Sequence, residues 1–177
     1  ISFVLMKRRQ WTSEFWAHVP ALTTSSDPRI RASISTALSG QGDLPDTVWA
    51  HIPALMQSSD DGILKSISTT LSNNSIWPKA VWAQVPRLMT NSSPGVQAAI
   101  ATALASQYKW PASVWAQAPS LMASPELYAK TCFSSALRSQ TKWPALFWAQ
   151  VPALMASSDP RTQAAIAQAL QGQANWP

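Results

Sequence analysis

The sequence is poor in charge, cysteine and glycine, and each shortage excludes a class of protein. Only 12% of its 177 residues are charged, so Ser, Thr, Gln and Asn must supply much of the polar surface. One cysteine excludes a disulfide framework and a four-thiolate zinc site. The five glycines form no phosphate-binding loop, and no apolar run approaches the roughly 18 residues that a membrane-spanning helix needs. We therefore expect a scaffold without a membrane span.

Tryptophan and proline, in contrast, are abundant, and both recur with a period of 33 residues. One tryptophan series is Trp16, Trp49, Trp82, Trp115 and Trp148. A proline follows each of these tryptophans at the same offset, at Pro20, Pro53, Pro86, Pro119 and Pro152. A fixed period of this length is typical of tandem-repeat architectures, in which each unit buries its apolar face against its neighbours.

The period divides the chain into five full repeats. They cover residues 11–43, 44–76, 77–109, 110–142 and 143–175. Residues 1–10 match the end of a preceding repeat, and residues 176–177 open a further one. We expect a single solenoid domain that is an excerpt of a longer array. Such a chain would be monomeric, with end-to-end association possible at its uncapped apolar ends.

Each repeat carries the pattern of two amphipathic helices. In residues 77–109, apolar residues recur at helical spacing over 81–89 and again over 96–104. Pro78 suits a first helical turn, and Ser93-Pro94 is a helix-start signal. No segment has a strand pattern. The sequence predicts an all-α, right-handed superhelix of five helical hairpins, with more than half of the residues helical.

Two recurring positions raise more specific expectations. Pro86 and its equivalents lie too deep for a first turn, so each should kink the first helix of its repeat. The tryptophans equivalent to Trp82 lie on the apolar stripe and should pack in the core. For the turn tryptophans, which are Trp77, Trp110 and Trp143, two alternatives stay open: a lid between repeats, or a half-exposed ring.

This pattern resembles the α-solenoid class of HEAT and armadillo repeats, in which a proline commonly bends the first helix. The turns Lys109-Trp110-Pro111 and Lys142-Trp143-Pro144 more narrowly resemble SKWP repeats, which occur in large type III effectors of plant-pathogenic bacteria. The resemblance implies a virulence protein that a bacterial type III system secretes into a host cell. It also implies that the repeats are an interaction surface for a host protein or peptide.

The sequence offers little for catalysis or for metal binding. His18 and His51 occupy one repeat position, and adjacent equivalents should lie about 10 Å apart, too far to share one metal ion. Most carboxylates fall at turns or helix starts, and no serine lies in a nucleophile elbow. Cys132 replaces a small residue of other repeats, which favours a packing role. We expect no enzyme activity, no metal and no cofactor.

The candidate binding surface is the outward face of the second helices. It comprises positions 29, 31, 32, 35, 36 and 39 and their equivalents, which vary most between repeats. The candidate binding residues are Arg29, Arg31, Lys65, Gln97, Lys130, Arg138 and Arg161. A non-catalytic protein-interaction scaffold is the favoured function. Because the net charge is +5, a nucleic-acid-binding array that uses this basic face is the alternative.

Overall fold

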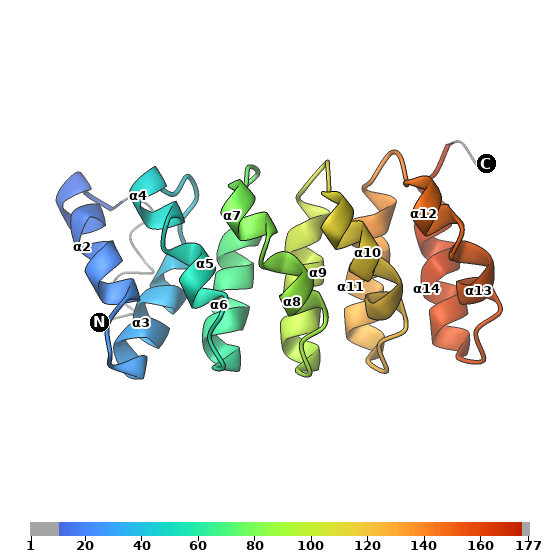
Figure 1. The fold of residues 1–177 in the computed structure, drawn as a ribbon, viewed down its shortest axis with the longest axis horizontal. Helices are drawn as coiled ribbons and strands as arrows, with labels where there is room; N and C mark the ends of the chain where they lie inside the picture. Colours follow the sequence, from blue (N-terminus) through green and yellow to red (C-terminus); the bar gives the residue numbers. More distant parts are fainter. Residues whose placement is uncertain (1–10, 175–177) are drawn as a thin grey trace. The chain divides into compact units, whose positions relative to one another are not determined.

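The structure is a computed structural model that describes residues 11–174, and its regular elements are all α-helices (Figure 1). More than half of the chain is helical, as the periodicity predicted. The fold class is an all-α solenoid of stacked helical hairpins. None of the helices within 11–174 is long and apolar enough to cross a bilayer. The expected partial repeats at 1–10 and 176–177 lie outside the described residues.

The chain forms two compact units, residues 1–84 and 85–177, and the first unit holds two hairpins and a short helix. Its helices are α2 (Ser13–Thr23), α3 (Pro28–Leu38), α4 (Asp46–Trp49), α5 (Ile52–Leu55), α6 (Asp61–Ser72) and α7 (Lys79–Trp82). The second helices α3 and α6 pack on each other, and so do α2 and α4 (Figure 1). Like helices of consecutive hairpins therefore lie side by side.

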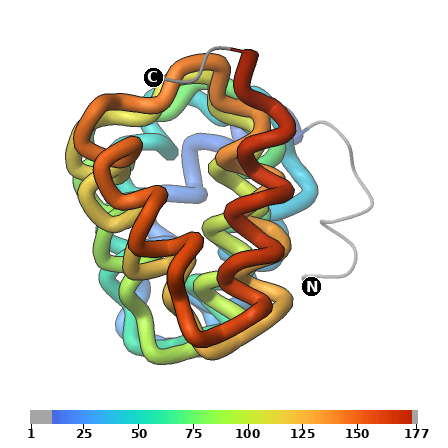
Figure 2. The backbone as a smooth tube through the Cα atoms, turned by 90° about the vertical axis from the view of Figure 1, so that its right-hand side faces the viewer, coloured from blue at the N-terminus to red at the C-terminus, as the bar shows by residue number. Residues whose placement is uncertain are grey.

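The second unit repeats this arrangement. Its helices are α8 (Val85–Met89), α9 (Pro94–Ala105), α10 (Ala112–Met122), α11 (Leu127–Arg138), α12 (Ala145–Trp148), α13 (Val151–Met155) and α14 (Pro160–Leu170). Helix α11 packs between α9 and α14, while α10 packs between α8 and α12. Figure 2 shows these two sets as separate layers, one of first helices and one of second helices.

The second helices begin at equivalent positions because their start signals repeat. Their first residues are Pro28, Asp61, Pro94, Leu127 and Pro160, one every 33 residues. Asp27, Asp60 and Asp159 cap three of these helices by accepting a backbone N–H at 2.8, 2.7 and 2.9 Å. The repeat boundaries themselves stay a prediction, since the two units divide within residues 77–109.

The prolines of the first helices leave some of these helices continuous and interrupt others. Helices α2 and α10 continue through Pro20 and Pro119. In contrast, α4 and α5 are separate, as are α12 and α13, and each break lies just before a proline. The break is a tight turn, in which the His51 N–H donates to the Val48 carbonyl at 2.9 Å. The expected kink is thus a full interruption in these repeats.

The turn tryptophans are buried and hold consecutive repeats together. Trp77, Trp110 and Trp143 are 5–7% exposed. Their indole Nε1–H groups donate to the carbonyls of Leu71, Leu104 and Leu137 at 3.0, 3.2 and 3.0 Å. These carbonyls lie in the last turn of the preceding second helix, and each also accepts the backbone N–H of the residue three positions further on. The half-exposed alternative is therefore wrong, and the turn tryptophans are the lids between repeats.

The tryptophans of the first helices are less uniformly buried than expected. Trp49 and Trp115 are buried, but Trp16, Trp82 and Trp148 are only half-buried. Each half-buried ring packs at a tilt against the turn tryptophan of its own repeat, with ring centroids 4.5–4.9 Å apart. The buried Trp115 packs in the same way against Trp110 and also contacts Phe147 of the next repeat, with ring centroids 5.4 Å apart.

A buried amide side chain recurs at the end of each hairpin, at a position that was not among the predicted functional or core residues. These residues, here called the amide ladder, are Gln41, Asn74, Gln107, Gln140 and Gln173. The Gln140 amide donates to the Gln107 carbonyl at 2.5 Å, and the Gln173 amide donates to the Gln140 carbonyl at 2.6 Å. Each of these two amides thus satisfies a backbone carbonyl of the preceding repeat, which would otherwise lose its water on stacking.

The amide ladder gives a first testable prediction. Gln140→Ala leaves the buried Gln107 carbonyl without its donor, so we expect a loss of about 1–3 kcal/mol in the free energy of unfolding. Urea denaturation followed by tryptophan fluorescence measures it. The matched control is Gln57→Ala at an exposed position, which should change stability by less than about 0.5 kcal/mol. Equal losses in both variants would contradict a structural role for the ladder.

Candidate functional site

The structure separates the candidate residues of the second helices into three groups. Arg29, Lys65, Arg138 and Arg161 are exposed, Arg31 and Gln97 are half-buried, and Lys130 is buried. The expectation that Lys130 points outward is wrong, because its side chain is only 1% exposed. Positions 35, 68 and 134 of the same expected face are also buried serines. Part of the expected binding face is therefore the contact between neighbouring second helices.

Arg31 and two of its repeat equivalents hydrogen-bond to the turn that joins the two helices of their hairpin. Arg31 donates from Nη1 to the Ser25 carbonyl at 2.5 Å. The equivalent glutamines behave alike: Gln97 Nε2 donates to the Asn91 carbonyl at 2.9 Å, and Gln163 Nε2 to the Ser157 carbonyl at 2.8 Å. Arginine and glutamine are both long donors. The exchange of arginine and glutamine at this position therefore keeps a donor to the turn, whereas its other equivalents differ: Leu64 is a buried apolar residue and Lys130 donates elsewhere.

Lys130 makes a different contact, which joins α11 to α14. Its Nζ donates to Asp159 Oδ2 at 2.5 Å and to Thr162 Oγ1 at 2.7 Å. The Lys130 ammonium, followed by the Arg161 guanidinium, holds the pKa of the Asp159 carboxyl well below its usual range. A buried ammonium is tolerated only when it is paired and hydrogen-bonded. This residue is structural, and it is unavailable to a ligand.

Two further cations of the expected basic face have carboxylate partners. Arg29 lies 3.3 Å from Asp27, and Arg161 lies 3.1 Å from Asp159. The hydrogen bonds from Arg29 lower the pKa of the Asp27 carboxyl. Of the candidate cations, Lys65 and Arg138 are the two for which residues 11–174 provide no ion pair or hydrogen bond. The face therefore carries no regular stripe of free positive charge.

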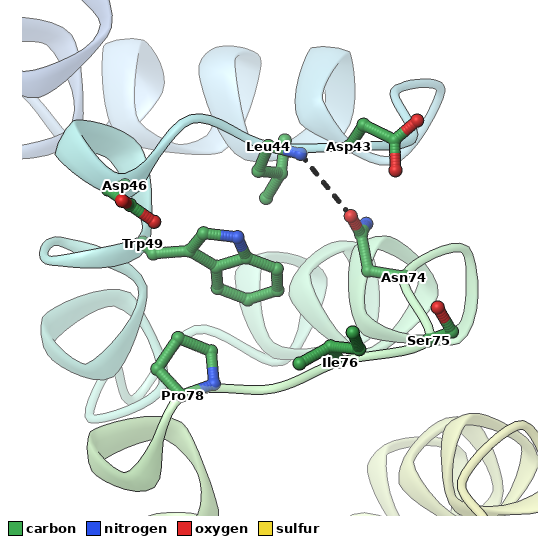
Figure 3. A pocket seen from close by; sticks show the side chains of 8 residues that line it. All are labelled: Asp43, Leu44, Asp46, Trp49, Asn74, Ser75, Ile76 and Pro78. Carbon is green, nitrogen blue, oxygen red and sulfur yellow. Dashed lines mark hydrogen bonds between the residues drawn. The ribbon is translucent and has the colours of Figure 1, made fainter.

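A groove of about 330 Å³ opens in the first unit, between the turn at residues 43–46 and the turn at residues 74–78. Its floor is the ring of Trp49, which lies between Leu44 and Pro78 (Figure 3). We call it the Trp49 groove; its lining is Asp43, Leu44, Asp46, Trp49, Asn74, Ser75, Ile76 and Pro78. Asn74 Oδ1 accepts the Leu44 N–H at 3.3 Å, which ties the two walls together.

An equivalent groove, of about 420 Å³, opens in the second unit. We call it the Trp115 groove; its lining is Trp110, Ala112, Trp115, Lys142, Trp143, Pro144 and Leu146. Trp115 and Pro144 occupy the repeat positions of Trp49 and Pro78. The two grooves therefore share their floor and one wall, although they lie in different units.

The rims of the two grooves differ in charge. Asp46 in the Trp49 groove corresponds to Ala112 in the Trp115 groove, and Ile76 corresponds to Lys142. Asp43 adds a second carboxylate to the first rim, at a positive φ of 51° that Asp tolerates better than most residues. One groove is thus acidic and the other basic, over the same tryptophan floor.

Other chemistry-bearing residues do not converge on a site. Within residues 11–174, no three His, Cys, Asp or Glu side chains lie close enough together to hold a metal ion. Cys132 is a half-buried free thiol on α11. It lies one turn from Tyr128, whose phenol pKa it raises. These residues provide no nucleophile with an adjacent base.

Comparisons with known proteins agree with the solenoid fold. No family model and no curated protein matches the sequence. Among solved structures, the chain is similar to computationally designed armadillo repeat proteins for modular peptide recognition, with a TM-score of 0.70 and 9% identity, over 97% of this chain and 90% of that one. A designed armadillo repeat protein in complex with the peptide (KR)4 has a TM-score of 0.65 and 9% identity, over 87% and 80% of the two chains.

A third similar structure is an engineered protein from the Northeast Structural Genomics Consortium. Its TM-score is 0.66 at 14% identity, over 97% of this chain and 89% of that one. At these identities the likeness concerns the fold alone. It supports the helical-repeat class that the sequence resembles, and it leaves the function to be argued from the residues.

The Asp159 network predicts a pH dependence of stability. The folded pKa of Asp159 lies below its unfolded value of about 3.9, so its contribution is present above that pH and is lost as the pH falls through the folded pKa. Asp159→Asn removes the charge and keeps a good helix cap. We expect the stability difference between the wild type and this variant to shrink as the pH falls from about 6 to about 2.

Thermal unfolding at a series of pH values measures this difference. Lys130→Met is the matched variant, because it removes the main cause of the lowered pKa and keeps the length of the side chain. Its stability should depend less on pH than that of the wild type over the same range. A wild-type advantage over Asp159→Asn that is constant with pH would contradict the pairing.

Proposed function

We propose that the chain is a non-catalytic scaffold that binds a protein or peptide partner. One observation carries the proposal: the same tryptophan-floored groove occurs at equivalent repeat positions in both units. Repeated grooves of this size suit the successive side chains of an extended segment. An enzyme that acts on one small substrate typically has a single enclosed pocket. The repeated open grooves of this chain differ from that arrangement.

The designed armadillo repeat proteins add support by analogy of fold. Their printed descriptions name modular peptide recognition and a bound (KR)4 peptide. Such solenoids present side chains of successive repeats along one surface. We extend peptide recognition to this chain because its grooves also recur with the repeat.

The nucleic-acid alternative loses its main support in the structure. Phosphate binding by a solenoid depends on many free cations along one face. Here Arg29 and Arg161 face carboxylates and Lys130 is buried. A protein or peptide partner is therefore the function that we propose.

Selection from a library of random peptides displayed on phage tests this proposal. We expect the immobilised chain to enrich a family of related peptides, and the free chain to compete for them. A duplex DNA probe is the comparison, and it should show no tight binding at about 0.15 M salt. Nanomolar and steeply salt-dependent DNA binding, without enrichment of peptides, would instead support the nucleic-acid alternative.

We also propose that the repeats belong to an effector that a bacterial type III system delivers into a host cell. The support is the resemblance of the turns at Lys109-Trp110-Pro111 and Lys142-Trp143-Pro144 to SKWP repeats. Host proteins or peptides are then the partners, and the role is virulence. In this proposal the repeats contribute the interaction surface.

A translocation assay tests this origin. The full parent protein, fused to a reporter that responds to the host cytoplasm, should give a signal with a secretion-competent bacterium. The same strain without a working type III system is the control. A signal that is equal in both strains, or absent in both, would contradict delivery by this route.

A further inference from the structure

We propose that the Trp49 groove binds an extended segment of a partner protein and selects a lysine or arginine side chain. The Trp49 indole N–H would donate to a backbone carbonyl of that segment, and Asp43 and Asp46 would pair with the cation. This inference rests on the proposed function and adds the chemistry of the partner. Three independent observations on the groove support it.

The first observation is an unused hydrogen-bond donor on the floor. Trp49 and Trp115 are each 8% exposed, and buried indole N–H groups normally have an acceptor. The turn tryptophans have one, in the carbonyls of Leu71, Leu104 and Leu137. For Trp49 and Trp115, no acceptor lies within hydrogen-bond distance in the described part of the chain.

The two unused donors keep some exposure to solvent, and both belong to rings that line a groove. Within residues 11–174, no fully buried side-chain nitrogen lacks a partner. The indole nitrogens of Trp49 and Trp115 must therefore keep some contact with solvent, and both rings line a groove. An indole nitrogen can only donate. The occupant of either groove must consequently bring an acceptor, and a backbone carbonyl is the acceptor that any peptide supplies.

The second observation is exposed apolar surface at the rims. Ile76 is 81% exposed on the rim of the Trp49 groove, and Leu146 is 64% exposed on the rim of the Trp115 groove. Together with the tryptophan on the floor, each of these side chains adds apolar surface to its groove, as is typical of binding sites. The apolar stem of a lysine or an arginine would cover Ile76 while its charged end reaches a carboxylate.

The third observation is charge. Asp43 and Asp46 lie on opposite sides of the Trp49 ring (Figure 3). Neither forms an ion pair or a side-chain hydrogen bond with a residue of the described part. A cation over the face of a tryptophan is also attracted by the ring itself. Carboxylates and an indole together favour a lysine or arginine over a neutral or acidic side chain.

The Trp115 groove is the internal control for this selectivity. It has the same free indole donor on its floor, but its rim carries Lys142 and no carboxylate. It should therefore accept the same peptide backbone and disfavour a cationic side chain. The two grooves share the indole donor and differ in the charge of the rim, so a comparison of the two helps to separate charge selection from general peptide binding.

Nuclear magnetic resonance of the indole N–H groups tests the proposal directly. The probe is a short capped peptide with one arginine between glycine and serine residues. Two control peptides carry citrulline or glutamate in place of the arginine. Citrulline has nearly the shape of arginine and no charge. The Trp49→Phe and Trp115→Phe variants of the full chain assign the two resonances.

We expect the arginine peptide to shift the Trp49 resonance in a saturable way and to leave the Trp115 resonance in place. Asp43→Asn with Asp46→Asn should weaken this binding about tenfold, because two ion pairs are lost. Asparagine tolerates the positive φ of position 43. The double variant should therefore fold, and an unchanged far-ultraviolet circular dichroism spectrum verifies that it does.

Three results would overturn the inference. Equal shifts of Trp49 by the arginine and citrulline peptides would rule out charge selection. A shift of Trp115 as large as that of Trp49 by the arginine peptide would remove the difference between the grooves. If peptides enriched on phage shift other resonances and leave Trp49 unmoved, the proposed function stands and this site fails.

Discussion

The hydrogen bond from a turn tryptophan to the end of the preceding second helix is the contact on which the stacking depends. The last carbonyls of any helix lack partners within it. Here the indoles of Trp77, Trp110 and Trp143 add a side-chain donor to such a carbonyl, and the same rings are buried. Each of these bonds joins the start of one repeat to the end of the second helix before it.

The tryptophan of the first helix forms the floor of each groove, beside Leu44 in the first unit and beside Trp110 in the second. In Trp49 and Trp115 that ring is buried with its N–H unused. The floor of each groove is therefore a product of repeat packing. The rim, with Asp43, Asp46 or Lys142, is free to differ because no neighbouring repeat depends on it.

The sequence predicted the architecture far better than it predicted the site. Residue spacing identifies the equivalent positions of the repeats, and helix-start residues such as Asp27 and Asp159 act locally. The repeat and the helix starts can therefore be predicted from the sequence alone. Which face of a helix contacts the neighbouring helix depends on the angle at which the two helices pack. The spacing of residues in the sequence does not give that angle. Lys130 was therefore expected on the surface, although it is buried against Asp159. The amide ladder was visible as a recurring Gln or Asn, but its burial was not.

Variability between repeats consequently has two physical origins in this chain. At the position of Arg31 and Gln97, two different long donors serve one turn carbonyl, whereas Lys130 at the same position joins α11 to α14. At the groove rims, Asp46 and Ala112 satisfy nothing inside the fold, so the exchange alters only the charge that a partner meets. A variable position indicates recognition when its side chain lacks an internal partner and lies beside a concave surface. The second helices fail that criterion at the position of Arg31, and the groove rims meet it.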